Sequence, residues 1–358
     1  MGREVLLKIL DLARWAPSGD NTQPWRFEIV SDSHIAIHGH DTREQVLYDF
    51  DGHASHMAHG ALLETLRLAA TRFGMAAEWC IRANSDDVKP IYDVTLKSSG
   101  VEEDPLVSFI ESRCVQRRPM QMTPLSCDQK SALLNAVGEE FSLVFFETFK
   151  DRLKVAKLLW DNANLRLTCP EAYEVHCHVI EWGARFSKDR IPEQAVGVDP
   201  VTAKLMRWVM KKWERVDFFN RYLMGTIAPR IQLDYLPAIF CAAHILIRPK
   251  TAPNCLDDWV NAGIAIQKVW LTATQLGLHL QPEMTPVIFR WYERANRSFS
   301  ARAEFRKKTL ALAQQFEFIA GKSALEPFSF FCRVGVSSSP RSRSVRFSVD
   351  ELINPIYF

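Results

Sequence analysis

The fold is decided by the stretch GALLETLRLAATRFGM at residues 60–75, which has a counterpart, GIAIQKVWLTATQLGL, at residues 263–278. The offset between them is constant, and both carry a glycine at the first position, an alanine at the eleventh and a glycine near the end. Because small residues let two helices approach closely, the repeat predicts two central helices packed side by side. The alternative is that any two amphipathic helices align this well.

Length, composition and net charge argue against several classes of protein. The chain has 358 residues, of which 47% are hydrophobic and 24% charged, as in folded proteins of about two domains. A formal net charge of only +2 gives no support to nucleic-acid binding or to a polybasic membrane role. No stretch approaches the roughly 18 apolar residues of a membrane helix, and the N-terminus lacks the apolar core of a signal peptide. The eight cysteines are scattered without a CxxC pair, so we expect a cytoplasmic protein without disulfides or zinc.

Hydrophobic periodicity outlines two segments, each with strands and one long central helix. We expect helices at residues 4–15, 53–73, 105–113, 151–182, 206–219, 259–276 and 301–318. Strands are expected at residues 25–30, 34–38, 77–83, 91–97, 141–147, 236–247 and 328–336. The fold class is therefore α+β, with two pseudo-symmetric halves and mixed or antiparallel sheets, and the halves divide into residues 1–104 and 105–358.

The segment at about 191–235 is harder to interpret. It holds a basic and aromatic helix at 206–219, which could cover a pocket as a lid or simply pack.

The loop after the first helix is the sharpest local signal. It begins at Pro17 and runs Ser18-Gly19-Asp20-Asn21-Thr22-Gln23-Pro24 into a strand at Trp25. Small residues let the backbone approach a ligand, and amide groups can read the edge of a flat polar ring. The residues alone leave open an ordinary helix-to-strand turn.

This loop resembles the flavin loop of the nitroreductase family in the pattern Ala16-Pro17-Ser18-x-x-Asn21-x-Gln23-Pro24-Trp25. The resemblance extends over most of the chain, more loosely over residues 130–235, and implies two nitroreductase-like halves. It also implies that FMN binds at Pro17, Ser18, Gly19, Asn21 and Gln23.

Two arginine-containing segments resemble other parts of the family pattern. Arg113 to Pro119 is similar to the Arg-x-Ser-x-Arg opening, which implies that Arg113 and Arg117 hold the phosphate and ring edge of FMN. The sequence departs from that pattern at Val115, where a hydroxyl residue is expected. By the same resemblance Arg346 is a second phosphate partner, and Pro282 and Glu283 present backbone to the flavin ring.

The order of the motifs implies a fused arrangement. The loop comes first and the arginines follow about a hundred residues later, whereas ordinary members have the reverse order and pair two chains. One complete flavin site can be assembled, and the second half lacks the amide-rich turn that another would need. We therefore expect a monomer that is itself a pseudo-dimer, or a homodimer of such chains.

The implied activity is that of an FMN-dependent oxidoreductase that reduces a small-molecule acceptor, with NAD(P)H as donor. The flavin would carry the chemistry, so no catalytic side chain is expected. The alternatives are a flavin-storage protein with little turnover and an oxygen-using flavin enzyme of a biosynthetic route. His53, His56 and His59 hint at a metal, but Asp51 beside them is equally a helix cap, and we expect none.

Overall fold

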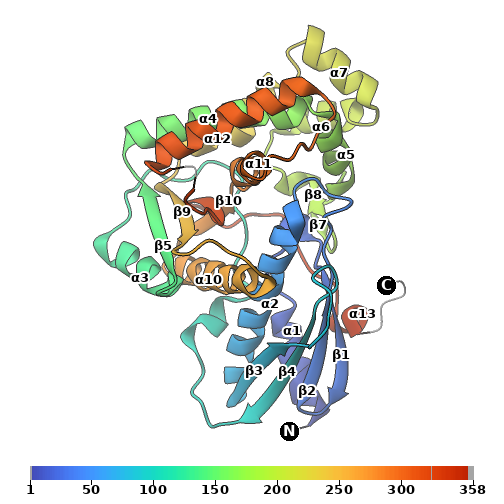
Figure 1. Cartoon of the computed structure of the whole chain (residues 1–358), viewed down its shortest axis with the longest axis vertical. Helices are drawn as coiled ribbons and strands as arrows, with labels where there is room; N and C mark the ends of the chain where they lie inside the picture. Colours follow the sequence, from blue (N-terminus) through green and yellow to red (C-terminus); the bar gives the residue numbers. More distant parts are fainter. Residues whose placement is uncertain (1, 324, 354–358) are drawn as a thin grey trace.

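The computed structural model describes residues 2–323 and 325–353. Its first sheet lies at one end of the molecule (Figure 1). All strands of this sheet are antiparallel, in the order β1 (Trp25–Ser31), β2 (His34–Gly39), β4 (Ile91–Ser98), β3 (Met75–Ile81).

The second sheet is also four-stranded and antiparallel. Its order is β10 (His279–Pro282), β11 (Phe330–Gly335), β9 (Ala243–Pro249), β5 (Phe141–Phe146). Two short parallel pairs stand apart from both sheets: β6 (Ile180–Glu181) with β8 (Ile191–Pro192), and β7 (Phe186–Ser187) with β12 (Arg343–Ser344). The expected α+β class is confirmed.

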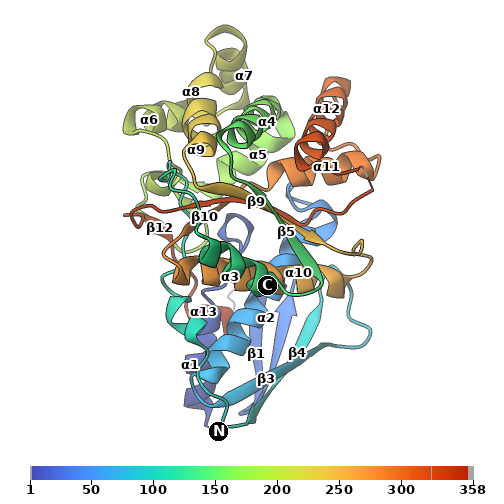
Figure 2. The same ribbon diagram turned by 90° about the vertical axis from the view of Figure 1, so that its left-hand side faces the viewer.

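Two long helices lie side by side between the sheets, as the repeat predicts (Figures 1 and 2). They are α2 (His53–Thr71) and α10 (Leu256–Gln275). Their backbones touch at the repeated glycines: a Cβ on Gly60 would lie 1.9 Å from the carbonyl oxygen of Val260, and one on Gly263 would lie 1.9 Å from that of Met57. Buried Gln267 donates from Nε2 to Oγ1 of Thr65 across the same contact, at 2.9 Å.

The two halves share one order of elements. The first runs α1 (Arg3–Ala13), β1, β2, α2, β3, β4, and the second runs α3 (Cys127–Val137), β5, β9, α10, β10, β11. The strand order in each sheet corresponds as well, and α1 packs on α2 as α3 packs on α10. In the second half, long insertions separate β5 from β9 and β10 from β11.

The inserted segments form a helical layer at the far end of the molecule (Figure 2). Its helices are α4 (Phe149–Thr168), α5 (Pro170–Val179), α6 (Pro200–Val209), α7 (Trp213–Tyr222), α8 (Ile227–Pro229), η5 (Arg230–Tyr235), α9 (Leu236–Ile239), α11 (Thr285–Arg294) and α12 (Ala303–Ala320). The remaining short elements are η1 (Gly19–Asn21), η2 (Phe50–Gly52), η3 (Pro105–Phe109), η4 (Glu193–Ala195) and α13 (Val349–Ile353). Within the described residues, no helix is both long and apolar enough to cross a membrane.

Four expectations about elements were wrong. The expected helical segment 151–182 is two helices, α4 and α5, which separate at Cys169 and are followed by β6. The expected strand 236–247 begins only at Ala243, because Leu236–Ile239 continues the helical turns of η5. The expected helix 206–219 is two helices, α6 and α7, which join at Met210 to Lys212. The expected helix 105–113 is only the short 3₁₀ turn η3.

The close contact between α2 and α10 predicts the direction in which a substitution at Gly263 changes the free energy of unfolding. In an exposed helix, replacing glycine by alanine stabilises a protein by about 1 kcal/mol. At Gly263 the new methyl group meets backbone, which cannot move aside, so we expect Gly263→Ala to reduce the free energy of unfolding by about 3 kcal/mol. Chemical denaturation measures the change, and Gly2→Ala, in open space, is the control. Stabilisation by Gly263→Ala would mean that the helices do not touch there.

Candidate functional site

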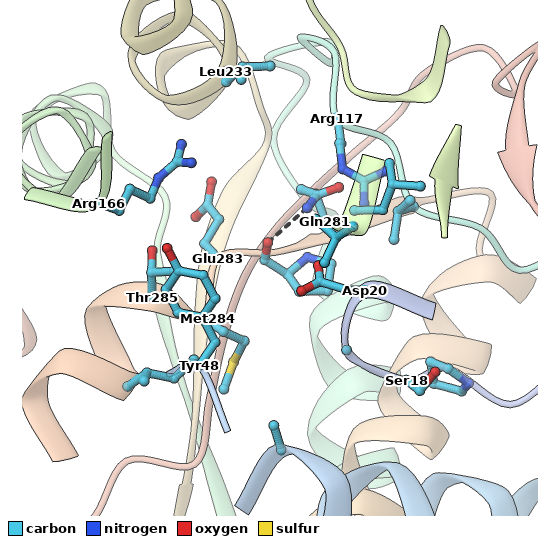
Figure 3. Close-up of a pocket in the computed structure, with 18 of the residues that line it drawn as sticks. Ser18, Asp20, Tyr48, Arg117, Arg166, Leu233, Gln281, Glu283, Met284 and Thr285 are labelled. Atoms are coloured by element: carbon cyan, nitrogen blue, oxygen red, sulfur yellow. Dashed lines mark hydrogen bonds between the residues drawn. The ribbon is translucent and has the colours of Figure 1, made fainter. Parts of the chain in front are cut away.

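A cavity of about 430 Å³ lies between the central helices and the helical layer (Figure 3). Its floor is the face of α2 at Ala54, Ala58 and Ala61, and Ile266 and Trp270 of α10 continue it. The loop at residues 17–20, the end of β10 and the inserted helices form the walls. A smaller pocket of about 70 Å³ adjoins it and shares lining residues with it, so the two spaces form one site.

The smaller pocket is cationic. Arg113, Arg117, Arg343 and Arg346 line it, and they come from two segments more than two hundred residues apart. The one carboxylate in this wall belongs to Asp20, and among the described residues it makes no hydrogen bond to any of these arginines. Arg343 was not among the residues expected from the sequence.

Burial leaves these cations poorly compensated. It lowers the pKa of Arg113 to about 10, with a contribution from Arg343. Burial also lowers the pKa of Arg346 well below its ordinary value, and Arg113 and Arg343 add to the effect by repulsion. The Nε atoms of Arg113 and Arg343 are buried without a hydrogen-bond partner among the described residues. An anion with several oxygens would satisfy both the charge and the free donors.

The loop at residues 17–23 is held in a conformation that side chains other than glycine rarely adopt. Asp20, Asn21 and Gln23 have φ angles of 48°, 66° and 49°. Such strain persists only where neighbouring groups enforce it, and it is common at ligand sites. Here the Ser18 hydroxyl accepts from the Gln23 N–H at 2.9 Å, and the Asn21 amide donates to the Val345 carbonyl at 3.1 Å.

Gln23 holds the loop to other segments of the chain. Its side chain is fully buried and lines neither cavity. Its amide donates to the carbonyl of Lys188 at 2.8 Å and accepts from the N–H of Phe347 at 2.9 Å. Gln23 therefore clamps the loop to two distant segments, which leaves it no group for a ligand. By contrast, Pro17, Ser18 and Gly19 line the larger cavity, and Asn21 lines the smaller pocket with its buried Oδ1 unpartnered.

Pro282 and Glu283, which were expected to present backbone to the flavin ring, lie at the end of β10. Both line the larger cavity, but Pro282 has no N–H, and that of Glu283 donates to the Phe331 carbonyl at 2.8 Å. The backbone of these two residues therefore has no N–H to offer a ligand. What Glu283 contributes is its side chain.

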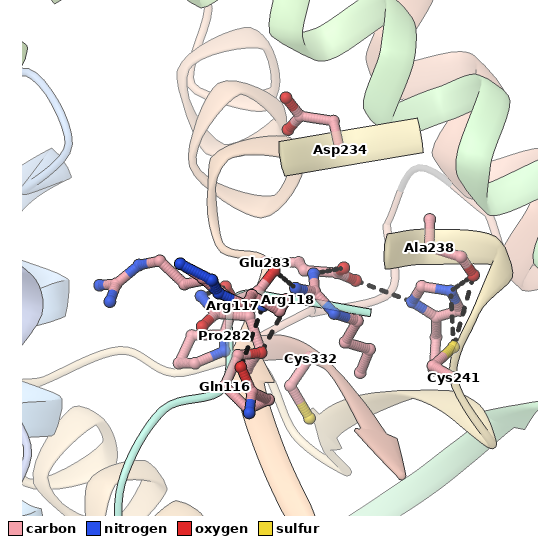
Figure 4. Close-up of polar contacts among 12 residues, drawn as sticks. Gln116, Arg117, Arg118, Asp234, Ala238, Cys241, Pro282, Glu283 and Cys332 are labelled. Atoms are coloured by element: carbon pink, nitrogen blue, oxygen red, sulfur yellow. Dashed lines mark hydrogen bonds and ion pairs between the residues drawn. The ribbon is translucent and has the colours of Figure 1, made fainter. Parts of the chain in front are cut away.

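The Glu283 carboxylate is the centre of a buried ionic network (Figure 4). It accepts from His244 Nδ1 and from Arg333, each at 2.7 Å. Burial alone would lower the pKa of His244, but Cys241 and Glu283 raise it to about 10, so the imidazole is charged. Arg333 also donates to the Arg117 carbonyl at 2.7 Å. The network thus fixes the backbone that carries Arg117 against the second sheet.

The end of the cavity away from the smaller, arginine-lined pocket holds two polar pairs that the sequence did not reveal. The Tyr48 hydroxyl and His176 Nε2 are 2.9 Å apart, and Arg166 donates to the Asp234 carboxylate at 2.8 Å. Burial raises the pKa of Tyr48 and lowers that of His176 to about 3, so both are neutral. Apolar side chains surround them: Leu159, Leu167, Val179, Ile180, Met206, Met210 and Leu233. Most come from the inserted segment, where no motif marks them.

The three histidines of α2 have structural partners. His53 stacks on Trp259 with ring centroids 3.7 Å apart, His56 bonds to the Asp87 carbonyl and His59 to the Pro24 carbonyl. Within residues 2–323 and 325–353 no group of three metal-ligating side chains is placed to hold an ion.

Comparison with known proteins gives one match in sequence and several in structure. Residues 1–50 match the family model described as "Nitroreductase family". No curated protein matches the chain.

Among solved structures, the FMN and NADPH-dependent nitroreductase NfnB from Sphigopyxis sp. strain HMH is 12% identical with a TM-score of 0.38, over 71% of this chain and 100% of that one. The nitroreductase with bound FMN from Bacteroides fragilis is 11% identical with a TM-score of 0.34, over 66% of this chain and 89% of that one. NfnB from Mycobacterium smegmatis, in complex with NADPH, is 11% identical with a TM-score of 0.37, over 69% and 96% of the two chains.

The family match covers α1, the strained loop and β1, and the loop of this segment forms one wall of the site. Residues 1–50 are thus similar in sequence to the nitroreductase family.

Proposed function

We propose that this protein is an FMN-dependent oxidoreductase with one flavin site per chain. The observation that carries the proposal is the convergence of buried and half-buried arginines from residues 113–117 and 343–346 beside the loop at residues 17–21. That loop lies in the segment that matches the nitroreductase family.

The residues present fit FMN in charge and in size. A flavin phosphate carries close to two negative charges, and the guanidinium groups of Arg113, Arg343 and Arg346 would hold it in the smaller pocket. The adjoining cavity of about 430 Å³ falls within the ~300–1,000 Å³ typical of cofactor sites. The small side chains of Ala54, Ala58 and Ala61 give that cavity a smooth floor for a flat ring.

When bound, FMN would supply two-electron transfer between NAD(P)H and a small acceptor. The chain's part is to bind, orient and exclude water. Tyr48 and Arg166 would receive the acceptor at the far end of the cavity, because a neutral hydroxyl and a guanidinium both donate to an electron-rich oxygen. The apolar side chains around them favour a small acceptor without net charge.

We further propose that residues 1–104 and 105–358 are two nitroreductase-like halves fused in one chain. The shared order of elements and strands supports this duplication. In the second half the turn between α3 and β5 is only Gly138, Glu139 and Glu140, where the first half has the long loop of the site. The segment 220–229 lies in the helical layer.

The phosphate assignment predicts which arginines matter. We expect Arg113→Ala, Arg343→Ala and Arg346→Ala each to raise the FMN dissociation constant by roughly ten- to a hundredfold, since a charge-assisted hydrogen bond contributes about 1.5–3 kcal/mol. Titration monitored by flavin fluorescence measures it. Arg72→Ala, which breaks only a surface pair with Glu103, is the control.

Riboflavin, which lacks the phosphate, separates this role from a general loss of structure. The three substitutions should change riboflavin affinity far less than FMN affinity. Equal losses for both flavins would remove these arginines from the phosphate site. If wild-type protein binds FMN tightly but oxidises neither NADH nor NADPH with any acceptor, storage replaces catalysis as the function.

The fused arrangement predicts one FMN per chain. A second flavin in the corresponding place of the second half would meet the carboxylates of Glu139 and Glu140 where the first meets amides and arginines. Flavin released from protein saturated with FMN, compared with chain concentration, should give a ratio near one. A ratio near two would contradict the one-site arrangement.

A further inference from the structure

We propose that the tip formed by α6, α7 and the turn that follows them is a docking surface for an anionic lipid bilayer. The tip comprises residues 200–227 and lies at the end of the molecule opposite the first sheet (Figures 1 and 2). Its aromatic residues were expected either to cover the pocket or to pack.

The structure leaves much of this apolar surface in solvent. All ten residues of α7 are exposed or half-buried. Phe218 is 52% exposed, Tyr222 70% and Met224 74%. On α6 the exposed apolar residues are Val201, Leu205 and Trp208, whose spacing places them on one face. Monomeric proteins rarely expose a continuous apolar surface of this kind without a partner.

Contacts between rings join the two helices into one surface. Trp208 meets Phe219 edge-on at 5.9 Å, and Phe218 lies 5.2 Å from Tyr222. Arg215 lies over the Trp208 ring at 4.5 Å. The exposed rings therefore keep fixed positions at the tip and are not free to fold back over the cavity.

The charges around the rings favour an anionic partner. Lys204, Lys211 and Lys212 are exposed and, in the described part of the chain, form no ion pair. Of the nearby acids, Asp199 caps α6 and Asp217 pairs with Arg221, whereas Glu214 is exposed without an ion pair in the described part of the chain. Lys204, Arg207, Lys211, Lys212, Arg215 and Arg221 outnumber the acids of this tip. Aromatic and aliphatic residues beside lysines are the composition with which amphipathic helices bind the interface of anionic membranes.

A second copy of this chain fits the surface less well. A two-fold dimer through the tip would bring the lysines of both copies, Lys204, Lys211 and Lys212, into one interface, where their like charges repel. A lipid surface supplies both the apolar layer and the negative charge. Docking would also bring α6 to the bilayer, and the inner face of this helix contributes Met206 and Met210 to the cavity.

Flotation of the full-length protein with vesicles tests the proposal. With vesicles containing a quarter phosphatidylglycerol in phosphatidylcholine, we expect at least about tenfold more bound protein than with phosphatidylcholine alone, and loss of binding at about 0.5 M salt. The combined variant Trp208→Ser, Phe218→Ser, Tyr222→Ser should lose binding, as should Lys204→Glu, Lys211→Glu, Lys212→Glu. Phe318→Ser, at a site 80% exposed elsewhere, should bind like wild type.

Two further measurements test whether each variant folds and whether Trp208 enters the bilayer. Thermal unfolding checks that each variant folds. Brominated lipid should quench wild-type fluorescence more than that of Trp208→Phe, because Trp208 enters the bilayer. Equal flotation of the serine variant and wild type, or no binding to anionic vesicles, would overturn the proposal. A dimer that the serine variant dissociates, without vesicle binding, would assign the surface to a second copy and overturn it as well.

Discussion

At Gly60 and Gly263 the backbones of α2 and α10 meet without any side chain between them. This contact sets the distance between the two sheets, because each helix packs on the sheet of its own half. It also sets the floor of the cavity, which α2 and α10 form together. Any larger residue at either glycine would push the helices apart and open the site along its whole length, so the contact constrains the shape of the cavity as well as stability.

The cationic pocket works against the stability of the ligand-free protein. Burial and mutual repulsion both lower the pKa of Arg346, which means that the fold places positive charge where it is unfavourable. Such an arrangement is retained when a bound anion returns the lost free energy. The His244–Glu283–Arg333 network differs, since each charge there has a partner, and its effect is to hold the backbone of Arg117 in place. The two sets of charges thus differ: the pocket arginines repel one another, whereas the network positions backbone.

Most of the helices and strands could be predicted from the sequence. Helical periodicity and matched glycines located α2 and α10, and alternation located most strands. The arginines of the site were found by motif, except Arg343, whose serine-rich surroundings resemble a solvated loop. The motif around Gln23 is local in sequence, and it implied a contact with the cofactor. The residues to which Gln23 bonds, Lys188 and Phe347, are distant in sequence, so a local motif could not reveal them. Tyr48, His176 and Arg166 could not have been found, since only the packing of the insertion brings them to one cavity.

The clamp at Gln23 has a consequence for how the protein is made. A ribosome synthesises the loop at residues 17–23 at the start of translation, but the groups that hold the loop in its strained form belong to Val345 and Phe347. The nascent first half can form its sheet and helices early, yet it must wait for these residues to emerge before the loop is fixed. The fixed form of the loop is then a property of chains translated past residue 347, and a truncated product would lack these two contacts.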